Sequence, residues 1–313
     1  MIEYVSPVTG EVLTQTADKL TGRSGTSFPI VNGIPRFVPI DNYASAFGYQ
    51  WKAYAKTQLD SFEGYSYSKD RLNTCLGYPM EQLKDKNVLE VGSGAGRFTE
   101  HLVKAGALTH CIDLSVAVEV NKENIGAATN YQIAQASVYE IPYPKASFDV
   151  VICIGVVQHT PSSERTIEAL WSMVKPGGQL VIDHYMWRLG YYFNPATYWR
   201  LYLKEIKPEK SKKIVDKLVD IFFPIHWALR NAPVLDWFVK RVSPVMTYMS
   251  HFPKISREEQ YQFSKLDSYD SLTDYYKHLR TPSQIRKELE SLGAKDIYVT
   301  KGGNGVEARA IKP

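Results

Sequence analysis

The sequence predicts an α/β protein built on a doubly wound, mostly parallel sheet. A buried strand, a glycine turn and the start of a helix follow one another over residues 88–98, and strands and helices then alternate as far as Asp183. Residues 148–157 form the longest β-rich apolar run, which is typical of a central strand covered on both faces. With 44% hydrophobic and 22% charged residues, the 313-residue chain has the composition of a globular protein.

Apolar runs, charge and cysteine content exclude several classes of protein. No apolar run approaches the ~20 residues of a membrane span. The N-terminus has no basic segment followed by an apolar core, so we expect a cytoplasmic protein without a transmembrane segment. A net charge of +4 is weak evidence for nucleic acid, and we expect no nucleic-acid partner. Cys75, Cys111 and Cys153 stand far apart, which predicts free thiols and no metal site.

The chain before the predicted sheet divides into two segments. Residues 1–40 contain short β-prone runs separated by glycine and proline, which predicts a small β-rich appendage. Residues 41–84 are expected to form capping helices, in which one helical stripe contains Phe47, Trp51, Tyr54 and Gln58. This stripe either packs into the core or belongs to a cap that closes a ligand site, with Trp51 and Gln58 reaching inward.

The glycine turn has the pattern E-x-G-x-G-x-G, with glycines at positions 92, 94 and 96. Glycine is needed where the chain turns sharply beside a ligand, because it reaches positive φ and has no Cβ. A dinucleotide fingerprint would place its third glycine where Arg97 stands, so the pattern predicts a different nucleotide-type ligand. Asp113 follows about 20 residues later, at the end of the next strand, where a carboxylate suits the vicinal diol of a ribose.

The remaining elements continue the alternation and are then interrupted. A long insertion over residues 185–280 is rich in aromatic residues and predicts a helical lid; alternatively, its basic and apolar part over 222–242 contacts a membrane surface. Prolines 224, 233 and 244 are expected to break any long amphipathic helix there. The expected helices cover residues 116–125, 162–174 and 283–292, and the expected strands cover 110–113, 131–134, 179–183, 296–300 and 306–311.

Four motifs together resemble one family. In order and spacing they are similar to the motifs of class I S-adenosylmethionine-dependent methyltransferases of the small-molecule type. The four are VLEVGSGAGRF, the acid Asp113, IPYPKASFDVVICIGVVQHT and LWSMVKPGGQLVI. The resemblance implies a Rossmann-like, mostly parallel seven-stranded sheet with an antiparallel last strand, formed by residues 85–184 and 281–313. The helical insertion would follow the fifth strand.

The N-terminal appendage carries a second resemblance. SPVTG and FPIVNGIPRFVP resemble the zinc-ribbon-like module of small Trm112-type proteins, but Ser6 stands at the cysteine position and no second ligand pair exists. Without thiolates such a module would be metal-free. It would then offer a dimer or lid surface, so we leave a homodimer open; the alternative is a hairpin packed on the core.

The family resemblance implies S-adenosylmethionine as cofactor and assigns residues to it. Glu90 and the turn at Gly92 to Gly94 would hold the methionine tail, and Asp113 the ribose. Ser137 stands where the family has an adenine-facing acid, so the Val138 backbone or Tyr139 could share that contact. The predicted cofactor-binding residues are Trp51, Gln58, Glu90, Gly92, Ser93, Gly94, Gly96, Arg97, Asp113, Leu114, Ser137, Val138, Ile154, Gly155 and Gln158.

Two histidines are candidates for catalysis. His159 follows the fourth strand at the edge where open α/β sheets bind ligands, and its ordinary pKa suits proton removal from a hydroxyl or ammonium. We predict that it acts as a base or orients the substrate, with a structural role as the alternative. His184, directly after the fifth strand, is the second candidate. Tyr185, Trp187 and Tyr191 are expected to bind the acceptor.

The leading hypothesis is therefore a methyltransferase that acts on an oxygen or nitrogen of a small metabolite, in a natural-product or glycan pathway. Three alternatives stay open: a nicotinamide-dependent oxidoreductase, a non-catalytic protein that binds S-adenosylmethionine or a partner, and a tRNA-directed methyltransferase. The acceptor cannot be identified because the insertion carries no recognisable motif.

Overall fold

The computed structural model describes residues 1–313 except 40–41, 45–47, 49, 52–53 and 250–254, so the prediction for Phe47 lies outside the described residues. Its centre is a seven-stranded sheet in the order β10-β11-β9-β8-β5-β6-β7. All neighbouring strands are parallel except β11, which runs antiparallel to both β9 and β10. The predicted doubly wound sheet with a reversed last strand is confirmed. The strands are β5 (Asn87–Val91), β6 (Leu108–Asp113), β7 (Tyr131–Gln135), β8 (Phe148–Cys153), β9 (Val174–Tyr185), β10 (Lys295–Gly302) and β11 (Gly305–Ile311).

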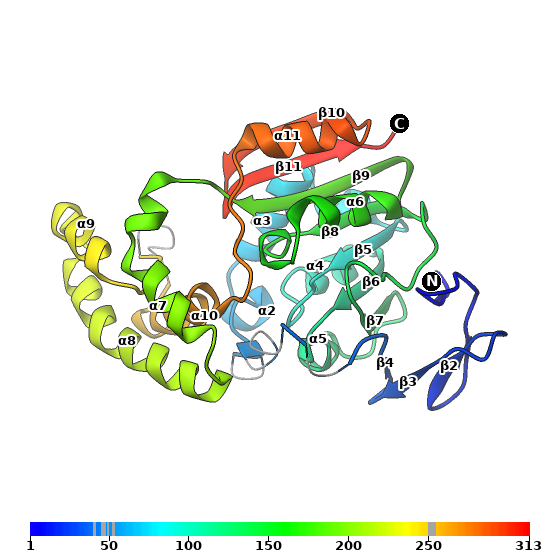
Figure 1. Ribbon diagram of the computed structural model, residues 1–313, viewed down its shortest axis with the longest axis horizontal. Helices are drawn as coiled ribbons and strands as arrows, with labels where there is room; N and C mark the ends of the chain where they lie inside the picture. Colours follow the sequence, from blue (N-terminus) through cyan, green and yellow to red (C-terminus); the bar gives the residue numbers. More distant parts are fainter. Residues whose placement is uncertain (40–41, 45–47, 49, 52–53, 250–254) are drawn as a thin grey trace.

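Helices cover both faces of the sheet because successive strand residues point to opposite sides. Leu89 and Val151 face a core closed by α6 (Ser163–Met173) and α11 (Pro282–Ser291). Val88 and Val150 face the opposite core, which is closed by helices from before and after β5 (Figure 1). These are α3 (Tyr67–Leu76), the 3₁₀ turn η1 (Met80–Leu83) and α4 (Thr99–Lys104), with α5 (Ala117–Ile125) beside them under β6 and β7. The short helix α2 (Asp60–Glu63) precedes α3.

The N-terminal appendage is a separate four-stranded antiparallel sheet that docks beside β7 (Figure 1). The backbone N–H of Phe37 donates to the Gln135 carbonyl at 2.8 Å, and the Tyr4 hydroxyl donates to the Ile133 carbonyl at 3.2 Å. Ser6 Oγ accepts the backbone N–H groups of the turn that follows it. Among the described residues no group of His, Cys, Asp or Glu could hold a metal ion. The strands are β1 (Thr14–Gln15), β2 (Lys19–Thr21), β3 (Ser27–Val31) and β4 (Ile34–Pro35).

The insertion after β9 is helical and has a hydrophobic core of its own, formed largely by residues such as Val215, Phe223 and Tyr269. Figure 1 shows it beside the sheet, with the N-terminal unit at the far end of the molecule. Its elements are the 3₁₀ turn η3 (Leu189–Phe193), α7 (Pro195–Leu203), α8 (Pro208–Leu229), α9 (Pro233–Val242) and α10 (Arg257–Thr273). No helix in the described ranges is long and apolar enough to cross a bilayer.

One expectation about this insertion is wrong. Pro224 lies inside α8, a continuous helix of 22 residues, rather than ending it. Proline removes one helical hydrogen bond, but Pro224 is exposed, and its neighbour Phe223 is buried in the core of the insertion. Packing of the buried helix face therefore outweighs the local preference of proline.

Candidate active site

A cavity of about 890 Å³ lies at the carboxyl ends of the parallel strands. Its walls include Val91 at the end of β5, Asp113 at the end of β6 and Ile154 just after β8. Strand β5 lies between β6, which follows it in the chain, and β8. The order of the strands therefore reverses at β5, and open α/β sheets bind their ligands at such a reversal. The helical insertion closes the opposite wall, with residues from η3, α7 and α10.

The glycine turn forms the floor of the cavity and leaves no room for side chains. Gly92 and Gly94 have φ of 76° and 50°, which favours glycine. A Cβ at Gly92 would overlap the Val156 side chain, and a Cβ at Gly94 would lie 3.1 Å from the indole of Trp51. Trp51 therefore lies directly over the turn and, with Gln58, lines the cavity.

Glu90 has a different position from the one the sequence suggested. Its carboxylate accepts a hydrogen bond from Thr99 Oγ1 at 2.7 Å, and Asn121 donates to the same hydroxyl at 3.1 Å. Burial raises the pKa of Glu90 to about 7. Neither Glu90 nor Gly96 is among the described residues that line the cavity. Glu90 thus supports the turn from beneath, because its strand position directs it into the helix layer.

Asp113 lines the cavity and is held in a fixed orientation. Its Oδ2 accepts the Gly94 N–H at 2.9 Å, and its Oδ1 accepts the N–H and hydroxyl of Ser115 at 2.8 and 2.7 Å. Burial raises the pKa of this carboxyl group. Ser137 lies outside the lining, where its hydroxyl accepts the Tyr139 N–H at 3.2 Å, whereas the neighbouring Val138 faces the cavity.

Arg97 connects the turn to the segment before β5 and to the insertion. Its Nε donates to Ser68 Oγ and its Nη1 to Gln58 Oε1, both at 2.9 Å. The Gln58 amide in turn donates to Asp267 on α10 at 3.3 Å. Burial lowers the pKa of Arg97, although a guanidinium stays charged. The arrangement offers a cation beside the glycine turn.

His159 ends the 3₁₀ turn η2 (Val157–His159) after β8 and faces the same cavity. Its Nδ1 lies 3.1 Å from Asp274 Oδ2 and 3.3 Å from the Tyr276 carbonyl. Two acceptors at Nδ1 keep the proton there, so Nε2 carries the basic lone pair. Burial alone would lower the pKa of His159, but the carboxylates of Asp270 and Asp274 outweigh it and raise the pKa.

Asp274 is fully buried and surrounded by cations. Lys277 Nζ lies 3.1 Å from its Oδ2, and Arg200 of α7 forms an ion pair with its other oxygen. Burial would raise the pKa of this carboxyl group, but Lys277 and His159 hold it below its usual value. Asp274 is therefore ionised and holds the imidazole of His159 in place.

His184 is placed differently from His159. Its Nε2 lies 2.9 Å from the Ser163 hydroxyl and its Nδ1 2.9 Å from the Tyr185 carbonyl, and burial lowers its pKa to about 4. It is not among the described lining residues, so its placement argues against the predicted catalytic role. Gln158, which is buried, and Trp187, which is exposed, are also not among the described lining residues.

The remaining predicted residues lie on the cavity wall. They are Ser93, Leu114, Gly155, Tyr185 and Tyr191.

The acidic wall of the cavity was missed from the sequence. Asp267 and Asp270 of α10 line the cavity, and Asp274 follows at the end of the same helix face. Burial, and then the neighbouring Asp270, raise the pKa of Asp267 to about 6. The signal was three aspartates at helical spacing (i, i+3, i+7) within an aromatic-rich insertion.

Comparisons with known proteins agree on the nature of this core. Residues 89–182 match the family described as "Methyltransferase domain". The ubiquinone biosynthesis O-methyltransferase of Azoarcus sp. (strain BH72) is 38% identical over 100 residues, which are 31% of this chain and 42% of that protein. The protein of the same name from Pseudomonas fluorescens is 35% identical over 104 residues, or 31% of this chain and 44% of that one. The chain thus matches less than half the length of these relatives.

Solved structures with similar folds are more distant. Magnesium protoporphyrin IX methyltransferase from Synechocystis PCC 6803 is 14% identical, with a TM-score of 0.46 over 87% of this chain and 97% of that one. Human N-acetylserotonin methyltransferase is 14% identical, with a TM-score of 0.46 over 88% of this chain and 60% of that one. From the sequence match and the strand order, residues 89–182 form the core of a methyltransferase domain.

Proposed function

We propose that this protein transfers a methyl group from S-adenosylmethionine to an oxygen of a small-molecule acceptor, with His159 as general base. The observation that carries the proposal is one cavity that joins the glycine turn to His159, whose Nδ1 lies 3.1 Å from the buried Asp274. The relatives over the core are named O-methyltransferases, which favours oxygen over the alternative, nitrogen.

The residues of the cavity fit the methyl donor. The donor has no phosphate, which agrees with a turn that keeps Arg97 instead of a third fingerprint glycine. Arg97 is a suitable partner for the carboxylate of the methionine tail, and the open backbone at Gly92 and Gly94 allows close approach. Asp113 Oδ2, which accepts one backbone N–H, has capacity for a ribose hydroxyl. Leu114 and Val138 offer an apolar wall to the adenine.

When bound, the donor supplies an electrophilic methyl group, and the chain contributes alignment and a proton acceptor. His159 takes the proton of the acceptor hydroxyl at Nε2. Asp274 keeps the other ring nitrogen protonated and stabilises the imidazolium that forms. Tyr185, in edge-to-face contact with the imidazole at 5.2 Å between ring centroids, and Tyr191 limit the access of water to this part of the cavity.

The test separates donor binding from catalysis. Titration calorimetry with S-adenosylhomocysteine is expected to show binding to the wild-type protein and to His159→Ala with similar affinity. A panel of hydroxylated acceptors is then assayed for methyl transfer, where His159→Ala should reduce turnover by roughly 10²- to 10⁴-fold. No binding of S-adenosylhomocysteine, together with stabilisation by NADH, would refute the proposal. Tight binding with no transfer to any acceptor would favour a non-catalytic binding protein.

A further inference from the structure

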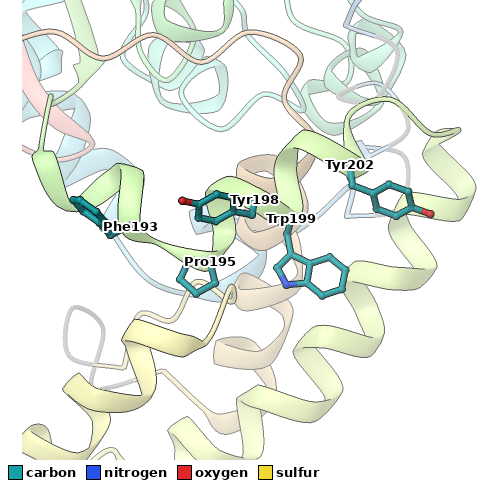
Figure 2. Close-up of a pocket in the computed structure, with 5 residues that line it drawn as sticks. All are labelled: Phe193, Pro195, Tyr198, Trp199 and Tyr202. Carbon is teal, nitrogen blue, oxygen red and sulfur yellow. The ribbon is translucent and has the colours of Figure 1, made fainter.

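The insertion exposes an unusual amount of apolar surface. Of the 23 large hydrophobic side chains exposed among the described residues, 15 lie between Trp187 and Val242, although this stretch is less than a fifth of the chain. Figure 2 shows five residues in a row along η3 and α7, where they line an open depression: Phe193, Pro195, Tyr198, Trp199 and Tyr202. Phe193 is 75% exposed, so little of its surface contributes to the fold. Contiguous exposed apolar patches of this kind mark sites of interaction.

Helix α9 extends this surface. Val234, Leu235, Phe238 and Val242 are all exposed and, at i, i+1, i+4 and i+8, share one side of the helix. None of the described side chains of α9 is buried. Trp237 is half exposed, and the Arg241 guanidinium lies 3.6 Å from the centroid of its ring. An apolar helix with this little contact to its own protein has a face available to a partner.

Helix α8 adds exposed lysines to this surface. Lys210, Lys213, Lys217, Ile221 and Ile225 form one exposed stripe at helical spacing, basic in its first half and apolar in its second. Residues 185–242 contain eleven Lys and Arg against five Asp and Glu, a net charge of +6, whereas the whole chain carries +4. The positive charge of the protein is thus concentrated where its exposed apolar side chains are.

We propose that the exposed side chains of η3, α7, α8 and α9, the lid surface, dock on an anionic lipid bilayer. Aromatic and aliphatic side chains next to lysines are typical of helices that lie in the membrane interface, where apolar groups enter the lipid and cations remain at the headgroups. A second copy of the chain fits less well, because two insertions that each have an excess of basic residues over 185–242 would repel each other. This inference stands independently of the reaction, since it concerns the outer side of the insertion.

Vesicle co-sedimentation tests the proposal with the full-length protein. We expect binding to vesicles of equal parts phosphatidylcholine and phosphatidylglycerol, weakening as salt is raised, and little binding to pure phosphatidylcholine. The variant Lys210→Gln/Lys213→Gln/Lys217→Gln should bind the anionic vesicles about tenfold to a hundredfold more weakly. These lysines are exposed, so their loss should leave thermal unfolding unchanged. The matched control is Lys84→Gln/Lys86→Gln/Lys287→Gln, three exposed lysines elsewhere, which should bind like wild type.

A second pair of variants tests the apolar contribution. Phe193→Ser/Phe238→Ser/Val242→Ser should lose most of the vesicle binding that persists at high salt, whereas Val8→Ser/Val12→Ser/Phe62→Ser, equally exposed side chains elsewhere, should retain it. Equal binding of the two variants would overturn the proposal, as would a wild-type protein that binds neither vesicle. A salt-resistant dimer in analytical ultracentrifugation that only the first variant dissociates would also overturn it, because the surface would then join two copies.

Discussion

Replacing Asp274 by Asn tests the role of His159 most directly. The carboxylate lies 3.1 Å from the imidazole, and an opposite charge at such a distance raises the pKa of a histidine by about 1 to 3 units. The neutral amide of Asn removes this effect. The cations Lys277 and Arg200 remain nearby, and their positive charge lowers the pKa of His159 further. His159 acts as a base only when deprotonated, so activity is lost as pH falls through its pKa.

The assay is the pH profile of kcat/KM for methyl transfer. In the wild-type protein the acid limb should lie above pH 6.5, because the pKa of His159 is raised. In Asp274→Asn the limb should move down by about 1 to 3 pH units. The plateau of kcat/KM at high pH should also fall. The amide N–H groups of Asn can face Nδ1 of His159 and favour the tautomer with the proton on Nε2, which cannot accept a proton there.

Stability has to be followed in the same variant. Removing one member of a buried ion pair costs about 3–5 kcal/mol, so the melting temperature should drop. The profile is therefore measured below that temperature, with His159→Gln as the control that has no titrating base. Asp270 also raises the pKa of His159 and remains in this variant, so an acid limb at the same pH in Asp274→Asn and in wild type would refute only the contribution assigned to Asp274.

Three further predictions concern the donor site and the fold. Gly92→Ala should abolish S-adenosylhomocysteine binding in calorimetry, because the added Cβ overlaps Val156 and the backbone has φ of 76°. Wild-type affinity in this variant would contradict the proposal that the donor binds against the glycine turn. Arg97→Gln should raise the Kd for S-adenosylhomocysteine about tenfold or more, since a charged hydrogen bond is lost; an unchanged Kd would place the methionine carboxylate elsewhere. His184 has a folded-state pKa lowered to about 4, so the unfolded chain takes up its proton first and stability should fall as pH decreases from about 6.5 to 4. Urea unfolding of His184→Gln should show a shallower loss over that range, and an equally steep loss would assign the effect to another group.

Local patterns predicted the core of the fold well. The glycine turn, the apolar run of β8 and the alternation of strands and helices depend on turn chemistry and periodicity, which neighbouring residues determine. Glu90 shows the limit of such patterns. The sequence places it beside the ligand-binding turn, yet its strand position turns its carboxylate toward Thr99, and only the three-dimensional packing reveals this.

The cavity wall around His159 could not be predicted because its residues come together from distant parts of the chain. Tyr276, which contacts His159, is 117 residues away in sequence, and Asp274 lies just before it. Nothing in the sequence around His159 indicates that the end of α10 packs against it. The position of His159 at the edge of the sheet could be predicted, because the end of a parallel strand is placed there by topology alone.

The hydrogen-bonded series Arg97–Gln58–Asp267 has a consequence for the order of events. In the proposed donor complex a carboxylate bound by Arg97 would lie beside Gln58, which the same guanidinium holds and whose backbone is in a left-handed conformation at φ 70°. Gln58 also donates to Asp267 on the α10 wall of the cavity, so under the proposed function the donor and the acceptor would share one hydrogen-bonded series. Coupling of this kind is reciprocal: if the donor tightens acceptor binding by some factor, the acceptor tightens donor binding by the same factor.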